Sequence, residues 1–174
     1  MATDMTDLTA EVRATIRATG QRALDNSTPE DKLNVVADLD FTFGTGASKC
    51  DQMFHDDRSL GAGASEDLDL AGSLTNAFGQ TVTFADVKAI YIENTSDDSG
   101  TTITVGNAAS NQFTGPLGAA AHTLTIPQGG FILLAADLAD VWTVTAGTGD
   151  LLKVLNDDGA NTATYKIVLL GESA

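Results

Sequence analysis

The chain has 174 residues, of which 43% are hydrophobic, so it can bury a core and does not have the composition of a disordered protein. Its 24 acidic residues far outnumber its nine basic ones, and the net charge of −15 excludes nucleic-acid binding, which requires clustered Lys and Arg. The apolar runs are shorter than the roughly 18 residues of a membrane-spanning helix, and the N-terminus does not resemble a secretory signal. The acidic surface favours solubility, or steering toward a basic partner.

The first 34 residues differ in pattern from the rest. Leu8, Val12 and Ile16 recur every four residues with arginines between them, which predicts an amphipathic helix over residues 6–25. The following Asn-Ser-Thr-Pro predicts a loop, and Pro29–Lys32 predicts one more short helical turn. We therefore expect residues 1–34 to be an N-terminal helical arm and loop.

This arm has too narrow an apolar stripe to form a core of its own. A single short helix is marginally stable in water, so it must pack on another surface. Packing on its own domain and packing on a neighbouring subunit remain equally open. Leu8, Val12 and Ile16 are therefore candidate subunit-contact residues.

From residue 35 onward the period becomes that of β-strands. Turn-forming sequences rich in Gly and Asp separate the apolar segments. The expected strands are Val36–Phe43, Lys49–Arg58, Glu66–Leu70, Thr81–Phe84, Val87–Asn94, Thr101–Val105, His122–Ile126, Gly130–Ala135, Trp142–Thr145, Asp150–Asn156 and Thr162–Leu170.

Many short strands joined by Gly-rich turns predict a mainly β domain over residues 35–174. We expect an antiparallel two-sheet sandwich, jelly-roll-like in topology. Two hairpins are predicted, one joining 90–94 to 101–105 and the other joining 151–155 to 165–170. Phe131–Leu134 and Ile167–Leu170 are apolar on both faces, so these strands should be central or covered by a partner.

The sequence offers little that is typical of catalysis. His55 and His122 are far apart and lack metal-ligand spacing, so we expect surface histidines and no metal or cofactor site. No phosphate loop, dinucleotide motif or nucleophile elbow is present. Paired carboxylates such as Asp157-Asp158 fit solvated turns better than Ca²⁺ ligands. No catalytic residue is assigned, and we expect the protein not to be an enzyme.

Two single-copy residues carry further expectations. Cys50 lies in a predicted strand, where a small buried hydrophobe is a better interpretation than a reactive thiol. Trp142 fits a core or subunit-interface position better than a sugar-binding platform. We include Trp142 among the candidate subunit contacts.

Four segments of the second half carry a resemblance to a known group of proteins. They are KAIYIENTS (Lys88–Ser96), TLTIPQGGFILLAAD (Thr123–Asp137), WTVTAGTGDLLKVLNDDG (Trp142–Gly159) and TYKIVLLGES (Thr164–Ser173). In their order and amino-acid sequence they resemble small β-sandwich virion proteins of tailed bacteriophages, which include capsid decoration (cement) proteins and minor head proteins. The resemblance covers about half of the chain, rests on turn and core motifs, and does not include the N-terminal arm.

The resemblance implies a structural role in the virion. Proteins of this group bind the outer capsid lattice, often as homotrimers, and stabilise the shell. The implied partners are the major capsid protein and further copies of the chain, with neither nucleic acid nor membrane. Two alternatives stay open: a tail, neck or receptor-binding spike module that binds a host glycan or another virion protein, and a non-viral carbohydrate-binding module or small hydrolase.

Overall fold

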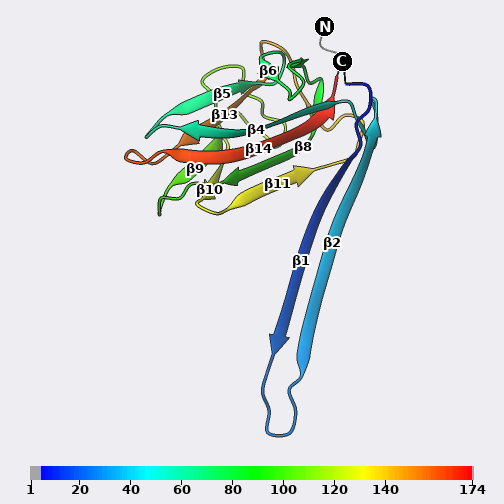
Figure 1. The fold of residues 1–174 in the computed structure, drawn as a ribbon, viewed down its shortest axis with the longest axis vertical. Coiled ribbons are helices and arrows are strands. Elements are labelled where there is room, and N and C mark those ends of the chain that lie inside the picture. Colours follow the sequence, from blue (N-terminus) through cyan, green and yellow to red (C-terminus); the bar gives the residue numbers. More distant parts are fainter. Residues whose placement is uncertain (1–4, 174) are drawn as a thin grey trace.

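The computed structural model describes residues 5–173, which fold into β-strands without a helix (Figure 1). A long two-stranded hairpin projects from a body of packed sheets (Figure 1). We call residues 10–43 the arm and residues 44–173 the body. The strands are β1 (Ala10–Gln21), β2 (Glu30–Phe43), β3 (Lys49–Cys50), β4 (Gln52–Leu60), β5 (Ser65–Asp69), β6 (Leu74–Thr75), β7 (Thr81–Val82), β8 (Asp86–Asn94), β9 (Thr102–Gly106), β10 (Thr123–Pro127), β11 (Phe131–Ala135), β12 (Trp142–Thr143), β13 (Leu151–Asn156) and β14 (Ala163–Glu172).

The predicted N-terminal helical arm is wrong, because the segment is a β-hairpin. Strands β1 and β2 pair antiparallel from Ala10 opposite Phe41 to Gln21 opposite Glu30. The short helical turn predicted at Pro29–Lys32 is also absent, since β2 begins at Glu30. The expected boundary at residue 35 lies inside β2, so one strand runs across it.

The physical reason for the error is an ambiguous spacing. An apolar residue at every fourth position fits the helical repeat of 3.6 residues. It also fits a strand, in which every second residue faces the same side, because four is a multiple of two. Between Val12 and Ile16 lies Ala14, and an Ala is compatible with either period. The deciding information lies outside the segment, in the facing strand β2, whose alternating apolar residues pair with those of β1. The pattern of residues 10–21 by itself therefore does not decide between helix and strand.

The body contains two main antiparallel sheets. One has the strand order β10–β9–β13–β5, and the other has the order β11–β8–β14–β4, with β12 also pairing with β8. Both sheets contribute to one hydrophobic core, with Ile103 and Val154 from the first sheet and Ile92 and Ile167 from the second fully buried. The prediction of a mainly β, antiparallel body is confirmed.

Most of the expected strands are present, but the two predicted hairpins are wrong. β8 and β9 lie in different sheets, and so do β13 and β14. At each crossing a buried asparagine occupies the end of the first strand. The Asn94 side-chain amide donates to the carbonyls of Thr101 and Ile126, and that of Asn156 donates to Leu60, Gly61 and Asn161. These bonds satisfy buried carbonyl groups that would bind backbone N–H groups of a paired strand in a hairpin. The chain can therefore pass from one sheet to the other.

A bulge shapes the end of the central strand pair β8–β14. The pairing register shifts between Leu170 and Gly171, which leaves Lys88 as the additional residue of β8. Gly171 is required here, because a Cβ at this position would lie 2.2 Å from the carbonyl oxygen of Asp86. The bulge is next to the root of the arm, where it matters for the site below.

Candidate interaction surface

The arm is amphipathic across its pairs of facing residues. Directly opposed residues of an antiparallel pair share a face, and successive residues alternate between faces. One face therefore carries apolar side chains from both strands, and we call it the apolar face of the arm. Its members are Ala10, Val12, Ala14, Ile16 and Ala18 of β1 and Leu33, Val35, Ala37, Leu39 and Phe41 of β2.

The inner end of this face is covered by the body. Phe41 is 2% exposed and forms a small core with Leu8 and Cys50, against which Val12 and Leu39 pack. Burial raises the pKa of the Cys50 thiol from 9.0 to about 11, which makes it an inert thiol at neutral pH.

The outer end of the same face is exposed to solvent. Ile16 is 62% exposed, and Leu33 and Val35 are about half exposed. The predicted contact residues therefore divide along the arm: Leu8 is buried, Val12 is half-buried and Ile16 projects from the body. A two-stranded ribbon is at best marginally stable alone in water, so this uncovered half has the composition of a surface that packs on something else.

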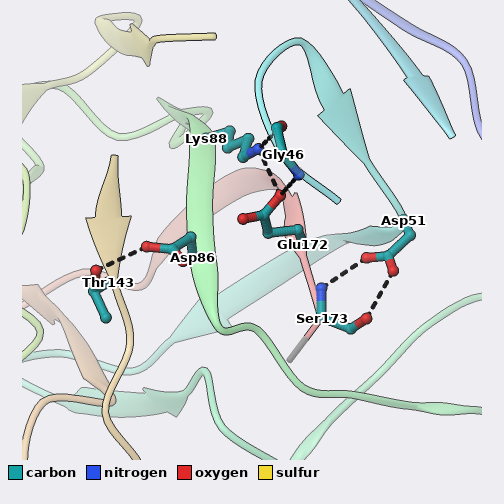
Figure 2. Close-up of polar contacts among 7 residues, drawn as sticks. All are labelled: Gly46, Asp51, Asp86, Lys88, Thr143, Glu172 and Ser173. Atoms are coloured by element: carbon teal, nitrogen blue, oxygen red, sulfur yellow. Dashed lines mark hydrogen bonds and ion pairs between the residues drawn. The ribbon is translucent and has the colours of Figure 1, made fainter. Parts of the chain in front are cut away.

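A polar network fixes the root of the arm to the body (Figure 2). The Glu172 carboxylate at the end of β14 accepts bonds from the Lys88 ammonium at 2.7 Å and from the Gly46 N–H at 2.6 Å. Lys88 also donates to the Gly46 carbonyl. The Lys88 side chain has no solvent exposure, so the ion pair lies in a low-dielectric site where both partners are needed. Since Gly46 belongs to the turn that follows β2, the network ties the arm to both central strands of the sheet.

Two further contacts hold neighbouring strand ends (Figure 2). Ser173 donates from its N–H and its hydroxyl to the Asp51 carboxylate, both at 2.7 Å. The Thr143 hydroxyl of β12 donates to Asp86 at the start of β8, at 2.8 Å. These bonds hold together the strand ends of the body that lie next to the root of the arm.

Next to this junction, the outward-facing side of the β11–β8–β14–β4 sheet is mostly apolar over β11, β8 and Val168 of β14, whereas His55, Asp57 and Lys166 make the side toward β4 polar. Ile90 and Ile92 point into the core, so the alternate residues of β8 point outward. The cross-strand pairing then places Tyr91 between Leu133 and Val168, and Phe131 at the edge is 62% exposed. The expectation that a strand with two apolar faces is central is confirmed for β14, whereas β11 lies at an edge of the sheet and its Phe131 is exposed.

A groove of about 320 Å³ separates this sheet face from the arm. On the arm it is lined by Glu11, Val12 and Arg13, and on the sheet by apolar side chains that include Tyr91, Leu133 and Val168. The rings of Tyr91 and Phe131 are 5.8 Å apart between centroids. We call this surface the arm–sheet groove.

The opposite face of the arm is mostly polar and carries charges of both signs, with Val36 as an exposed apolar member. Arg13 contacts Glu11 and Asp38, whereas Arg17 donates to the Asn34 side chain and is not ion-paired within residues 5–173. Arg22, in the turn at the arm's tip, likewise has no ion-pair partner in the described part of the chain. The arm holds four basic and six acidic residues, and the sequence after residue 43 holds five basic and sixteen acidic ones.

Trp142, the remaining predicted contact residue, lies in the two-residue strand β12. It is half-buried, pairs with Val87 and packs against the main core. A Cβ at position 115 would lie 2.7 Å from the Cβ of Trp142. The glycine at this position therefore allows the close packing of Trp142. Trp142 is therefore placed away from the exposed half of the arm's apolar face, as a side chain that packs on the body.

The histidine and acidic side chains noted in the sequence do not lie together in the fold. His55 and His122 are both exposed, and no group of three or more His, Cys, Asp or Glu residues within residues 5–173 could hold a metal ion. The Asp158 carboxylate is already occupied, because it accepts bonds from the N–H groups of Ala160 and Asn161, the Asn161 amide and the Thr101 hydroxyl. These bonds lower the Asp158 pKa from 3.8 to about 2.

Comparison with known proteins identified no relative, so the evidence on function comes from the interaction surface. No protein-family model matches the chain, and no curated protein matches its sequence. Within residues 5–173, no helix is long and apolar enough to cross a membrane.

Sequence reasoning missed the arm's amphipathic hairpin and the groove beside it. A signal for the hairpin was present in the strict alternation Leu33, Val35, Ala37, Leu39 and Phe41, which is typical of a strand with one buried face. The groove had no local signal, because its residues come from strands far apart in the chain.

Proposed function

We propose that the protein is a non-enzymatic structural protein of a phage virion that binds the outer capsid lattice and stabilises it. The observation that carries this proposal is the arm: a clamped β-hairpin whose apolar face is half covered by its own body and half exposed. An exposed apolar face on a rigid projecting element is typical of a protein that completes its packing in an assembly.

The strand order of the body supports a jelly-roll-like sandwich, the architecture we propose for residues 44–173. One main sheet has four antiparallel strands and the other has five, and of the neighbours in those two sheets only β9 and β10 are consecutive in the chain. Long connections that pass between sheets are characteristic of jelly rolls, which are frequent in viral capsid proteins. The resemblance of Lys88–Ser96 and the later segments to phage virion proteins supports the same role.

The proposed partners are the major capsid protein and further copies of the chain, in a homotrimer on the capsid surface. The acidic body would remain in solvent and discourage unspecific aggregation. The arm would make the attachment, since its exposed apolar residues and unpaired arginines lie together at one end of the molecule.

Virions assembled with and without the protein test this proposal. We expect the protein to be present in many copies per particle, and its omission to lower the temperature at which the shell opens. Adding back purified wild-type protein should restore the stability, whereas an Ile16→Asp variant should not. A matched Thr15→Asp variant, altered on the polar face of the same strand, should restore it.

A low copy number would instead place the protein in the tail, the neck or a spike. Unchanged shell stability after its omission, combined with absence from the particle, would contradict a virion role altogether.

A further inference from the structure

The edge strand β11 has backbone groups that no other strand binds. It forms the border of the body on the side toward which the arm projects (Figure 1). The Ala136 N–H donates to the Lys88 carbonyl and the Asn94 N–H donates to the Gly130 carbonyl, so the even-numbered residues of 130–136 bond to β8. In an antiparallel ladder the residues between them point their N–H and C=O groups away from the neighbouring strand. These residues are Phe131, Leu133 and Ala135, whose outward backbone groups have no hydrogen-bond partner within residues 5–173.

Other strand edges of the fold carry features that oppose pairing, whereas β11 does not. Natural edge strands are commonly protected by charged side chains or proline. The edge strands β4 and β5 each contain three Asp, Glu or Arg side chains, and β10 ends at Pro127. The arm has charged side chains on both of its strands, such as Arg17 of β1 and Asp38 of β2. The sequence of β11 is Phe-Ile-Leu-Leu-Ala, which is apolar throughout.

The main core is also incompletely covered beneath this edge. Ile132 and Leu134 of β11 pack against the core, but both are only half-buried. Ile90 and Ile92, the corresponding residues of the neighbouring strand β8, are 2% and 0% exposed. One more strand beside β11 would therefore remove apolar area from water and give partners to the unpaired N–H and C=O groups.

We propose that the free edge of β11 receives an extended segment of another polypeptide, which adds to the sheet as a further strand. The segment has apolar side chains at its centre and Lys or Arg at its ends. This inference goes beyond attachment by the arm, because it assigns a second surface of the molecule and does not depend on the virion role.

Charge complementarity identifies the basic ends of the segment. Residues 89–152, which include β11, contain six acidic residues and no Lys or Arg. Glu93 pairs opposite Phe131 at the start of β11, and Asp137 follows the end of the strand. Acidic side chains therefore lie near both ends of the free edge, where Lys or Arg of an added strand would meet them.

The same charges disfavour a second copy as the added strand. Pairing of β11 with β11 of another copy would bring like charges of two acidic bodies together, which is destabilising. Arg13, the basic side chain that lines the arm–sheet groove, is already in contact with Glu11 and Asp38. A basic segment of a different protein is the better match.

Synthetic peptides test the inference on the full-length protein. The probe has a centre of five alternating Val and Thr residues, the length of β11, with Lys residues at each end. Because alternate amides of a strand point to the same edge, N-methylation of every second amide leaves one edge free and prevents the peptide from stacking on itself. Two control peptides of equal length carry Glu in place of Lys, or N-methyl groups on every central amide.

We expect the Lys probe to slow the hydrogen exchange of the Phe131, Leu133 and Ala135 amides, measured by NMR spectroscopy. In the free protein these amides face water and should exchange rapidly, whereas those of Ile132 and Leu134 bond to β8 and should already be protected. The Glu peptide should bind at least about tenfold more weakly, and the fully methylated peptide should give no protection.

Two positions of equal exposure separate the edge from the rest of the surface. Phe131 and Phe78 are both 62% exposed. Phe131→Lys places a like charge on the edge and should weaken binding of the Lys probe by about tenfold, whereas Phe78→Lys should change the affinity by less than about twofold.

A backbone substitution tests the pairing itself. Ala135→Pro removes an N–H that makes no bond to β8, and edge strands tolerate proline at such positions. The variant should therefore fold, as checked by circular dichroism, and should lose the protection by the probe. If it does not fold, Phe131→Lys still decides the question.

Four results would overturn the inference. Absence of protection at millimolar Lys probe would show that the edge does not accept a strand, and equal binding of the Lys and Glu peptides would contradict a basic partner. Protection confined to arm amides such as those of Arg13 and Arg17 would place the added strand on the arm. Wild-type dimers that Phe131→Lys dissociates would identify a second copy as the occupant. None of these measurements involves virions, so the inference can fail while the proposed virion role stands.

Discussion

Lys88 holds a positive charge at a position where its side chain has no solvent exposure, and Glu172 is its only carboxylate partner within residues 5–173. A buried ion pair adds little over a well-packed apolar pair, because desolvation offsets most of the Coulomb attraction. Removing one partner is a different matter, since the remaining charge is then buried alone. The pair therefore makes the junction between arm and body sensitive to single substitutions.

Glu172→Gln should lower the free energy of unfolding by about 3–5 kcal/mol, because it leaves Lys88 buried without a counter-charge. Urea denaturation measures the change. The exposed pair of Lys166 and Asp57, 4.0 Å apart, provides the control: Asp57→Asn should cost less than ~1 kcal/mol. Equal effects of the two substitutions would contradict a structural role for the buried pair.

The Asp158 carboxylate accepts hydrogen bonds from within the turn after β13 and from the Thr101 hydroxyl. These bonds lower the Asp158 pKa from 3.8 to about 2. A carboxyl group with a lowered pKa in the folded state stabilises the protein above 3.8, and that contribution is lost as the pH falls toward 2. Thermal unfolding should therefore show a fall in midpoint over this range. Asp158→Asn should lower the thermal midpoint at neutral pH and weaken the dependence of that midpoint on pH. Asp97→Asn, at an exposed position, should change neither the midpoint nor its pH dependence.

At the scale of elements, the arm shows how pairing decides secondary structure. Residues 10–21 have no strong preference of their own, and the strand state becomes favourable when β2 supplies an apolar residue opposite each apolar residue of β1. The inner end of the hairpin then gains the cover of the body through Phe41. The two ends of one face thus experience different environments.

Substitution along the arm should separate these environments. Phe41→Ala should destabilise the monomer by about 3–5 kcal/mol, because it opens a cavity in the small core beside Cys50. Ile16→Ala should change monomer stability by less than ~0.5 kcal/mol, because the side chain is mostly in solvent. Chemical denaturation at low protein concentration makes the comparison. A large loss for Ile16→Ala under those conditions would mean that the outer arm packs on its own body.

At the scale of the whole molecule, the arm and the main core are separable. All buried residues of the main core lie between Phe54 and Leu169, so they belong to the body alone. The arm contributes to the smaller core at its root and otherwise projects away (Figure 1). Stability and attachment are therefore assigned to different parts of the chain.

Replacing residues 13–38 by a short turn should leave the body folded, with a cooperative thermal transition close to that of the full chain. The same variant should lose self-association in sedimentation velocity experiments, because it lacks the exposed half of the apolar face. Loss of the cooperative transition would show that the arm is needed for folding and not only for attachment.

The sequence by itself determined the β character of the body. Alternating or fully apolar segments bounded by glycines and aspartates, such as Val87–Asn94 and Gly130–Ala135, are local signals, and the strands were found where those signals occur. It also determined that Cys50 is a buried side chain, since a small apolar group in a strand near the sheet is covered by its neighbours.

Tertiary structure alone decided the state of the arm, the sheet to which each strand belongs and the position of the groove. A spacing of four residues fits both a helix and a strand, so the state of β1 depends on a partner strand that begins nine residues after β1 ends. The hairpins expected at Asn94 and Asn156 failed because side-chain amides there bind carbonyls from other loops and strands, which no local pattern encodes. The arm–sheet groove joins Val12 to Phe131 and Val168, and only the folded chain brings such distant residues to one surface.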